Sequence, residues 1–133
     1  GAALHDHPAD VVGCSPTNSA VMHHSVAAGR VLTMESLPTW SDSTAGGVEL
    51  DTVTFAACQR FVADWVLVDE AAIADAMKIV IGREHLLIEG AAGVAVAGLM
   101  ARAEAYRGRK VVAVLCGSNL SPSALGRLYE GGA

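Results

Sequence analysis

Short apolar runs alternate along the chain with longer stretches in which apolar residues recur at helical spacing. Three runs have the length and composition of strands that are buried on both faces: residues 10–16, 64–70 and 110–115. After the second run, four apolar residues fall on one face of a helix that Asp69 can cap: Ile73, Met77, Val80 and Ile81. Strands that alternate with helices predict an α/β fold, in which helices flank a mainly parallel sheet in three layers.

Capping residues and glycines mark the ends of the other helices. We expect these helices over four segments: residues 17–29, 51–63, 88–106 and 121–129. The first ends at Gly29, where a C-terminal glycine belongs, and the last begins with a capping Ser121 followed by Pro122. Residues 30–50 lack a strong periodicity and contain Gly46 and Gly47, which predicts a long loop of the kind that often carries function.

Three parallel strands leave the sheet with uncovered edges, so they form a poor core by themselves. Apolar residues make up 52% of the chain, which is more than in an average soluble domain. Both features suggest that further strands come from another segment or another chain. The length of 133 residues suits one domain, which we take as residues 1–133.

Charge and cysteine content narrow the classes of function. The formal net charge is −5 and the basic residues are scattered, so nucleic acid is not an expected partner. The three cysteines are far apart and form no CxxC pair, which argues against a disulfide framework and a zinc site. The histidines show no metal-ligand spacing, and the longest apolar stretch is too interrupted to span a bilayer. We therefore expect a cytoplasmic protein without a metal or a membrane segment.

The richest candidate for chemistry is the turn after the third apolar run. Ligands of open α/β sheets bind beyond the carboxyl ends of the strands. There, Cys116 offers a thiol, Gly117 a tight turn with free backbone groups, and Asn119 an amide that can donate and accept. The alternative is that Cys116 is a buried cysteine that acts as a small hydrophobic residue.

Two further candidates are Glu89 and the polar loop around Ser43. A carboxylate inside the apolar run that holds Glu89 is costly to bury without a partner, although an acid that caps the following helix explains it equally well. Asp42, Ser43 and Thr44 precede Gly46-Gly47 in the long loop, which is either part of a site or an ordinary surface loop.

Several motifs in one order resemble the C-terminal part of the threonine/serine ammonia-lyases, or dehydratases. The matching stretches are "VVGCSPTNSAVMHHSVAAG", "LPTWSDSTAGGVELDTVTFAACQRFVADWVLVDEAAIADAMKIVI", "EHLLIEGAAGVAVAGL" and "KVVAVLCGSNLS". That family comprises fold-type II pyridoxal-phosphate enzymes of the tryptophan synthase β superfamily. The resemblance implies that residues 1–133 are the C-terminal part of the large, cofactor-binding domain.

The resemblance also implies roles by position. Cys116 matches the residue that hydrogen-bonds the pyridine nitrogen of the cofactor, and a neutral thiol there suits the elimination of a hydroxyl group. Gly117 and Asn119 shape that turn, Glu89 matches the acid near the cofactor, and Ser43 matches a position, usually glycine, that packs near its ring. Relatives that bind a divalent cation use acids where this chain has Ser15 and Val21, so no metal site is carried over.

The lysine that binds the cofactor covalently lies in the N-terminal half of the family's chains, and neither Lys78 nor Lys110 matches it. We therefore expect no catalytic residue and no covalent cofactor here. The complete enzyme would convert a small β-hydroxy amino acid to a 2-oxo acid and ammonia, with the N-terminal half or a second copy as partner. The alternative is a truncated or split paralogue that acts as a non-catalytic pairing or scaffold subunit.

Overall fold

The computed structural model describes residue 3 and residues 6–130 of the chain. In this part of the chain the sheet consists of two parallel strands, β1 (Val11–Pro16) and β2 (Val62–Val68). A bulge between Val11 and Val12 sets the register, after which Val12 lies opposite Asp64 and the strands stay paired to their carboxyl ends. Both carboxyl ends therefore meet at one edge of the sheet, as parallel pairing requires.

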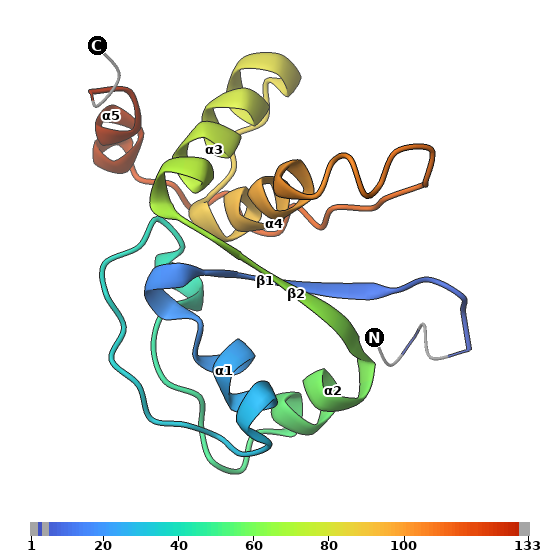
Figure 1. Ribbon diagram of the computed structural model, residues 1–133. Coiled ribbons are helices and arrows are strands. Elements are labelled where there is room, and N and C mark those ends of the chain that lie inside the picture. Colours follow the sequence, from blue (N-terminus) through green and yellow to red (C-terminus); the bar gives the residue numbers. More distant parts are fainter. Residues whose placement is uncertain (1–2, 4–5, 131–133) are drawn as a thin grey trace.

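Helices cover both faces of the two strands (Figure 1). The helices are α1 (Val21–Ala28), α2 (Val53–Phe61), α3 (Glu70–Glu84), α4 (Gly90–Ala101) and α5 (Pro122–Glu130). Figure 1 shows α1 and α2 on one side of the strands, and α3 and α4 on the other, with α5 beyond α3. The described residues also form the 3-10 turns η2 (Thr17–Ser19), after β1, and η3 (Asp42–Thr44), in the long loop. The predicted α/β class with a helix-flanked parallel sheet is confirmed.

Local capping explains where several helices begin and end. The side chain of Asp69 accepts a hydrogen bond from the backbone N–H of Ala72 at 2.8 Å, so it caps α3 as the sequence predicts. Gly29 ends α1 in the left-handed conformation, with φ of 69°. The predicted helix over 88–106 is shorter than expected, because α4 ends at Ala101 and a series of turns follows.

The predicted strand over residues 110–115 does not form. This segment is extended but carries no strand pairing in the described part of the chain, and its apolar side chains face outward. Val112 is 88% exposed and Val114 is 67% exposed. A strand is stabilised by hydrogen bonds to a neighbouring strand, and among the described residues no strand pairs with this segment, so the strand-like sequence stays unpaired.

The core lies between the sheet and the helices α3 to α5. Its fully buried residues include Ile73 and Met77 of α3, Ala92 of α4 and Leu128 of α5. Small residues let α4 approach its neighbours closely. A Cβ at Gly98 would lie 2.5 Å from the Sγ of Cys14, so β1 and α4 pack closely there. Among the described helices, none has the length and apolarity needed to cross a membrane.

We predict that Gly93→Ala destabilises the protein and that Gly82→Ala stabilises it. A Cβ at Gly93 would lie 2.7 Å from the Cγ of Met77 and 3.2 Å from the Cγ2 of Ile73. Overpacking of this kind costs about 1–3 kcal/mol. Gly82 lies on the exposed face of α3 with nothing within 4 Å of its Cβ position, so alanine there should add about 0.5–1 kcal/mol. Urea denaturation measures both, and a stabilising Gly93→Ala would show that α3 and α4 are not closely packed.

Candidate functional site

The carboxylate of Glu89 joins two segments that are far apart in the sequence. Its Oε1 accepts a hydrogen bond from the Ser43 hydroxyl at 3.0 Å, and its Oε2 accepts one from the backbone N–H of Asn119 at 3.1 Å. Glu89 occupies the N-cap position of α4, but its side chain makes no capping hydrogen bond. Helix capping therefore does not account for this acid, whose oxygens serve the long loop and the turn after Cys116.

Gly117 lets the turn wrap closely around Glu89. Its φ of 86° belongs to the left-handed region that favours glycine. A Cβ on Gly117 would overlap the carboxylate of Glu89, so a side chain there is both strained and blocked. The carbonyl of Gly117 also accepts a hydrogen bond from the backbone N–H of Glu89 at 3.3 Å. The two residues are thus held together through both backbone and side chain.

The turn η3 places Ser43 beside Glu89. Just before this turn, the Ser41 hydroxyl is fully buried and lies 2.6 Å from the Thr44 hydroxyl. The Asp42 carboxylate accepts a hydrogen bond from the Ser43 backbone N–H at 2.8 Å. These local bonds fix a compact turn whose exposed side points the Ser43 hydroxyl toward the start of α4.

A small residue at the start of α4 brings the loop close. Gly90 packs against the backbone of Trp40, and a Cβ at Gly90 would overlap the Trp40 carbonyl. The Trp40 backbone N–H in turn donates to the Oε2 of Glu70 at 2.7 Å, which anchors the loop to the start of α3. The glycine after Glu89 is therefore needed for the close approach that puts Ser43 within reach of the carboxylate.

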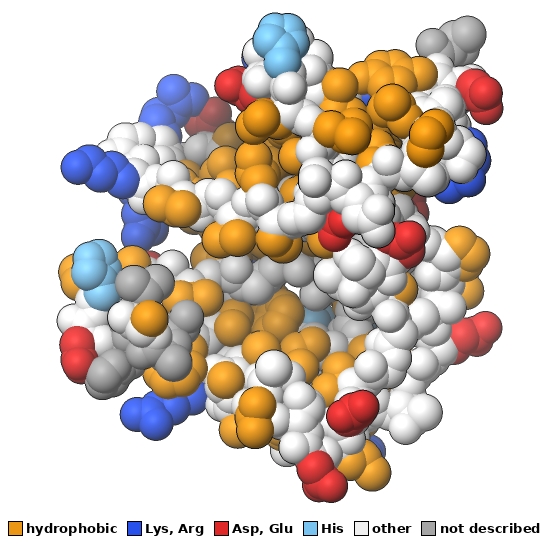
Figure 2. All heavy atoms as spheres, turned by 180° about the vertical axis from the view of Figure 1, so that it is seen from behind, with side chains coloured by type: hydrophobic (Ala, Val, Ile, Leu, Met, Phe, Trp, Pro, Cys, Tyr) orange, Lys and Arg blue, Asp and Glu red, His pale blue; other side chains and the backbone are white. Residues whose placement is uncertain are grey.

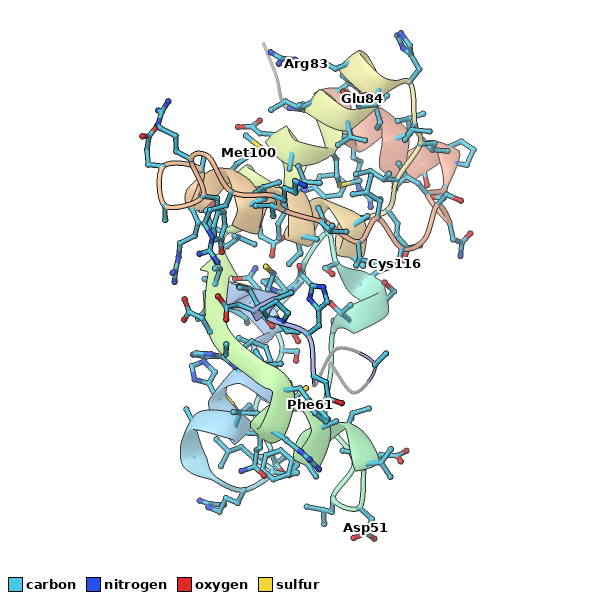
Figure 3. The ribbon with its side chains drawn as sticks, turned by 90° about the vertical axis from the view of Figure 1, so that its right-hand side faces the viewer. Asp51, Phe61, Arg83, Glu84, Met100 and Cys116 are labelled. Carbon is cyan, nitrogen blue, oxygen red and sulfur yellow. The ribbon has the colours of Figure 1, made fainter. Side chains whose placement is uncertain are left out.

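Cys116 lies next to this cluster and is exposed to solvent. Figure 3 shows it close to the start of α4 and to η3. Because it is exposed, the alternative of a buried small hydrophobic residue is wrong for Cys116. Cys14, by contrast, is half-buried and packs against α4. Burial raises the pKa of the Cys14 thiol, although Arg102 partly offsets this. Burial likewise raises the pKa of Cys58.

The structure therefore brings together four of the residues that the sequence singles out, namely Glu89, Ser43, Gly117 and Asn119, with Cys116 beside them. Neither lysine of the chain belongs to this cluster. Lys78 lies within α3, and Lys110 lies at the start of the exposed extended segment. The described residues also contain no group of His, Cys, Asp or Glu side chains that could hold a metal ion.

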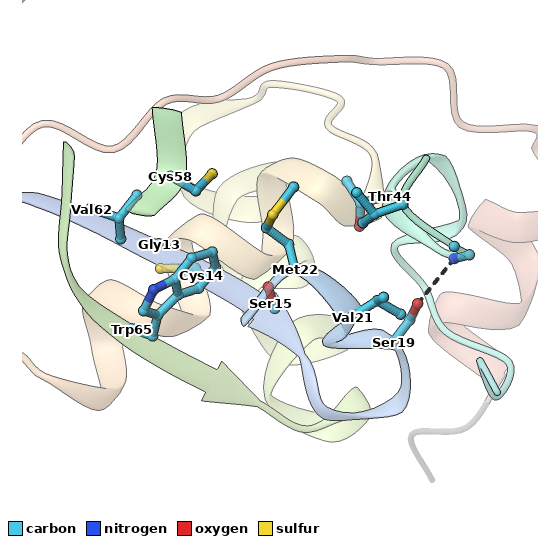
Figure 4. Close-up of a pocket in the computed structure, with 13 residues that line it drawn as sticks. Gly13, Cys14, Ser15, Ser19, Val21, Met22, Thr44, Cys58, Val62 and Trp65 are labelled. Atoms are coloured by element: carbon cyan, nitrogen blue, oxygen red, sulfur yellow. Dashed lines mark hydrogen bonds between the residues drawn. The ribbon is translucent and has the colours of Figure 1, made fainter. Parts of the chain in front are cut away.

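A hollow of about 340 Å³ lies on the other face of β1 (Figure 4). Its lining comes from β1, β2, α1, α2, η2 and the long loop, and includes Gly13, Met22, Cys58 and Trp65. Trp65 packs directly against Gly13, where a Cβ would lie 2.6 Å from the indole ring. No local sequence pattern marks this hollow or the tertiary hydrogen bonds that anchor the loop beside it, so neither can be predicted from the sequence.

Comparison with known proteins points to one family. Residues 1–117 match the family described as "Pyridoxal-phosphate dependent enzyme". The chain is 30% identical over 122 residues to the L-threonine ammonia-lyase of Thermotoga maritima, and the match covers 92% of this chain and 30% of that protein. It is also 30% identical over 122 residues to the biosynthetic, chloroplastic threonine dehydratase of Solanum tuberosum, with 90% of this chain and 34% of that protein covered.

Solved structures agree with this match. The processed form of threonine deaminase isoform 2 from Solanum lycopersicum superimposes with a TM-score of 0.86 at 28% identity, over 98% of this chain and 38% of that one. Maize serine racemase has the same fold, with a TM-score of 0.81 at 23% identity over 98% of this chain and 42% of that one. The chain thus spans about a third of the length of the curated relatives it matches.

We predict that Gly117→Ala costs more stability than Gly108→Ala. Both glycines have positive φ, 86° and 77°, so alanine at either position carries a similar backbone strain of about 1–2 kcal/mol. Gly108 has open space around its Cβ position, whereas at Gly117 the new methyl group would displace the Glu89 carboxylate. The lost hydrogen bonds should add about 1 kcal/mol to the Gly117 variant. Equal losses in urea denaturation would contradict the close contact between Glu89 and Gly117.

Proposed function

The chain belongs to the pyridoxal-phosphate dependent enzyme family, and from this premise we propose that it is part of a threonine/serine dehydratase-like lyase. The complete enzyme would convert a β-hydroxy amino acid to a 2-oxo acid and ammonia. The observation that carries the proposal is the convergence of Ser43, Gly117 and Asn119 on Glu89, beside an exposed Cys116. Relatives named as threonine dehydratase or ammonia-lyase support the substrate class.

The donor set around Cys116 fits the ring end of pyridoxal phosphate. An uncharged thiol can donate a hydrogen bond to an unprotonated ring nitrogen, and Cys116 is exposed where a ligand can reach it. The carboxylate of Glu89 is already engaged by Ser43 and Asn119, so it holds the turn in place and leaves the nitrogen to Cys116. Residues Cys116, Gly117, Asn119, Glu89 and Ser43 would thus form the ring side of the cofactor site.

Bound pyridoxal phosphate would supply an electron-withdrawing ring that acidifies the Cα–H of an amino acid. The protein's part is to bind and orient that ring. In our proposal, Cys116 binds the ring nitrogen without protonating it. The ring then withdraws electrons less strongly than a protonated ring would, which suits loss of a β-hydroxyl group. Gly117 leaves room beside the ring, and the hydrogen bonds that Glu89 accepts from Ser43 and Asn119 keep the turn in place.

The rest of the enzyme would complete the site and the sheet. The chain contains only Lys78 and Lys110, and neither stands in the cluster, so the lysine and phosphate contacts would come from the N-terminal half or, in a homo-oligomer, from a second copy. Apolar side chains lie exposed on the face seen in Figure 2, and the chain's exposed apolar residues include Val112 and Val114. We propose that strands of the remaining part of the large domain cover residues 110–115, and that residues 1–133 alone catalyse nothing.

The absence of a lysine from the cluster favours a second candidate function, a pairing or scaffold subunit without catalysis. In that case the fold and the hydrogen bonds of Glu89 to Ser43 and Asn119 would have a structural role only. The two functions differ in one observable property, namely whether the Cys116 side of the site supports product formation once a lysine-bearing portion is present.

A chimaera tests the proposed function. This chain replaces the matching segment of the Thermotoga maritima L-threonine ammonia-lyase, and cofactor absorbance and 2-oxo acid release from L-threonine and L-serine are measured. We expect both cofactor binding and oxo acid release. Cys116→Ser should keep most of the activity because a hydroxyl makes the same uncharged hydrogen bond. Cys116→Ala should weaken cofactor binding about fivefold, the effect of one lost hydrogen bond.

The isolated chain, reduced with borohydride in the presence of cofactor, should carry no site-specific adduct on Lys78 or Lys110.

Controls separate the possible failures of this experiment. The parent enzyme, rebuilt through the same cloning junctions, controls for damage at the joints, and circular dichroism reports whether the chimaera is folded. A folded chimaera that binds cofactor but releases no oxo acid would contradict the lyase and favour the pairing subunit. A folded chimaera that binds no cofactor would contradict the cofactor site. Identical behaviour of the chimaera and its Cys116→Ser and Cys116→Ala variants would contradict it as well.

A further inference from the structure

A buried hydroxyl in η2, the turn that follows β1, is hydrogen-bonded to both ends of the loop that carries Ser43. Ser19 is 6% exposed, and its Oγ lies 2.8 Å from the Ser36 hydroxyl. The same oxygen accepts a hydrogen bond from the backbone N–H of Gly46 at 3.1 Å, which Figure 4 shows as a dashed line from Ser19. Ser36 precedes η3 and Gly46 follows it, so one side chain holds the loop on both sides of the turn.

The neighbouring Asn18 strengthens the first of these attachments. Its backbone carbonyl accepts a hydrogen bond from the Leu37 N–H at 2.8 Å, and its side-chain amide donates to the Pro38 carbonyl at 2.6 Å. The segment before η3 is therefore fixed by several bonds. The segment after η3 is joined to η2 through the Gly46–Ser19 bond, which makes Ser19 the residue that closes the loop.

The chemistry of a hydroxyl suits this double attachment. A serine oxygen has two acceptor lone pairs and one donor hydrogen, so it can accept from Gly46 and still pair with Ser36. Alanine can do neither. The buried position in η2 also limits the size of the side chain, and serine is the smallest residue that offers this combination.

We propose that Ser19 is a positioning residue, which holds Ser43 against the Glu89 carboxylate by closing the 36–46 loop. It touches neither Ser43 nor Glu89 through any bond that the structure contains, and it acts through the loop alone. Its relevance to cofactor binding rests on the proposed function, whereas the positioning itself is a property of this chain. The competing explanation is that the bonds within η3 and the Trp40–Glu70 bond place Ser43 without help, so that Ser19 only stabilises the fold.

The backbone amide resonance of Asn119 separates these explanations. Asn119 donates to the other oxygen of Glu89 and has no hydrogen bond with the loop, so its amide reports on the carboxylate. We expect Ser19→Ala to shift the Asn119 amide in the same direction as Ser43→Ala does. In the Ser43→Ala background, Ser19→Ala should add no further shift. Hydrogen exchange at the Gly46 amide should rise about fivefold in Ser19→Ala, as one lost hydrogen bond predicts.

Two further variants keep the test decisive. Ser36→Ala removes one of the two attachments from a partly exposed position and should shift the Asn119 amide in the same direction, even if Ser19→Ala folds poorly. Thr54→Ala removes an exposed hydroxyl on α2 that is bonded to Thr52, and should leave Asn119 unchanged. An unchanged Asn119 amide in folded Ser19→Ala and Ser36→Ala would overturn the proposal, as would a shift that persists in the Ser43→Ala background. Failure of the chimaera to bind cofactor would leave these results untouched and would count only against the proposed function.

Discussion

The Glu89 carboxylate is the interaction on which the rest of the site depends. It lies at the amino end of α4, where the helix dipole favours a negative charge, yet its two oxygens accept hydrogen bonds from other segments of the chain. One oxygen holds the long loop through Ser43 and the other holds the turn that carries Cys116. Without this carboxylate nothing in the described structure joins the Ser43 loop directly to the Cys116 turn.

Two glycines make this arrangement possible, and both follow from the need for close approach. Gly90 admits the Trp40 carbonyl, and Gly117 admits the carboxylate itself. A glycine inside a helix costs about 1 kcal/mol relative to alanine, so the glycines along α4 lower its intrinsic stability. Close packing of α4 against α3 and β1 offsets that cost. Small residues of α4 thus allow both the close packing that stabilises the fold and the close approach that forms the site.

Sequence patterns predict the features that depend on neighbouring residues alone, such as helix caps and strand positions. The Asp69 cap, the Gly29 helix end and the positions of β1 and β2 follow from short-range signals, and the family motifs singled out the residues around Glu89. The segment 110–115 has the composition of a strand, but pairing depends on a neighbour that no local pattern supplies. Ser19 was missed as a site residue for a similar reason, since its role arises from bonds to residues far along the chain.

The most direct test of the central claim is the pattern of backbone amide shifts that Glu89→Ala causes. If the carboxylate joins the two segments, the amides of Ser43 and Asn119 both shift, although they lie far apart in the sequence. Glu84→Ala, which removes an exposed carboxylate at the end of α3, should leave both unchanged. Shifts confined to residues next to position 89 would contradict the account, because the loop and the turn would then be held without Glu89.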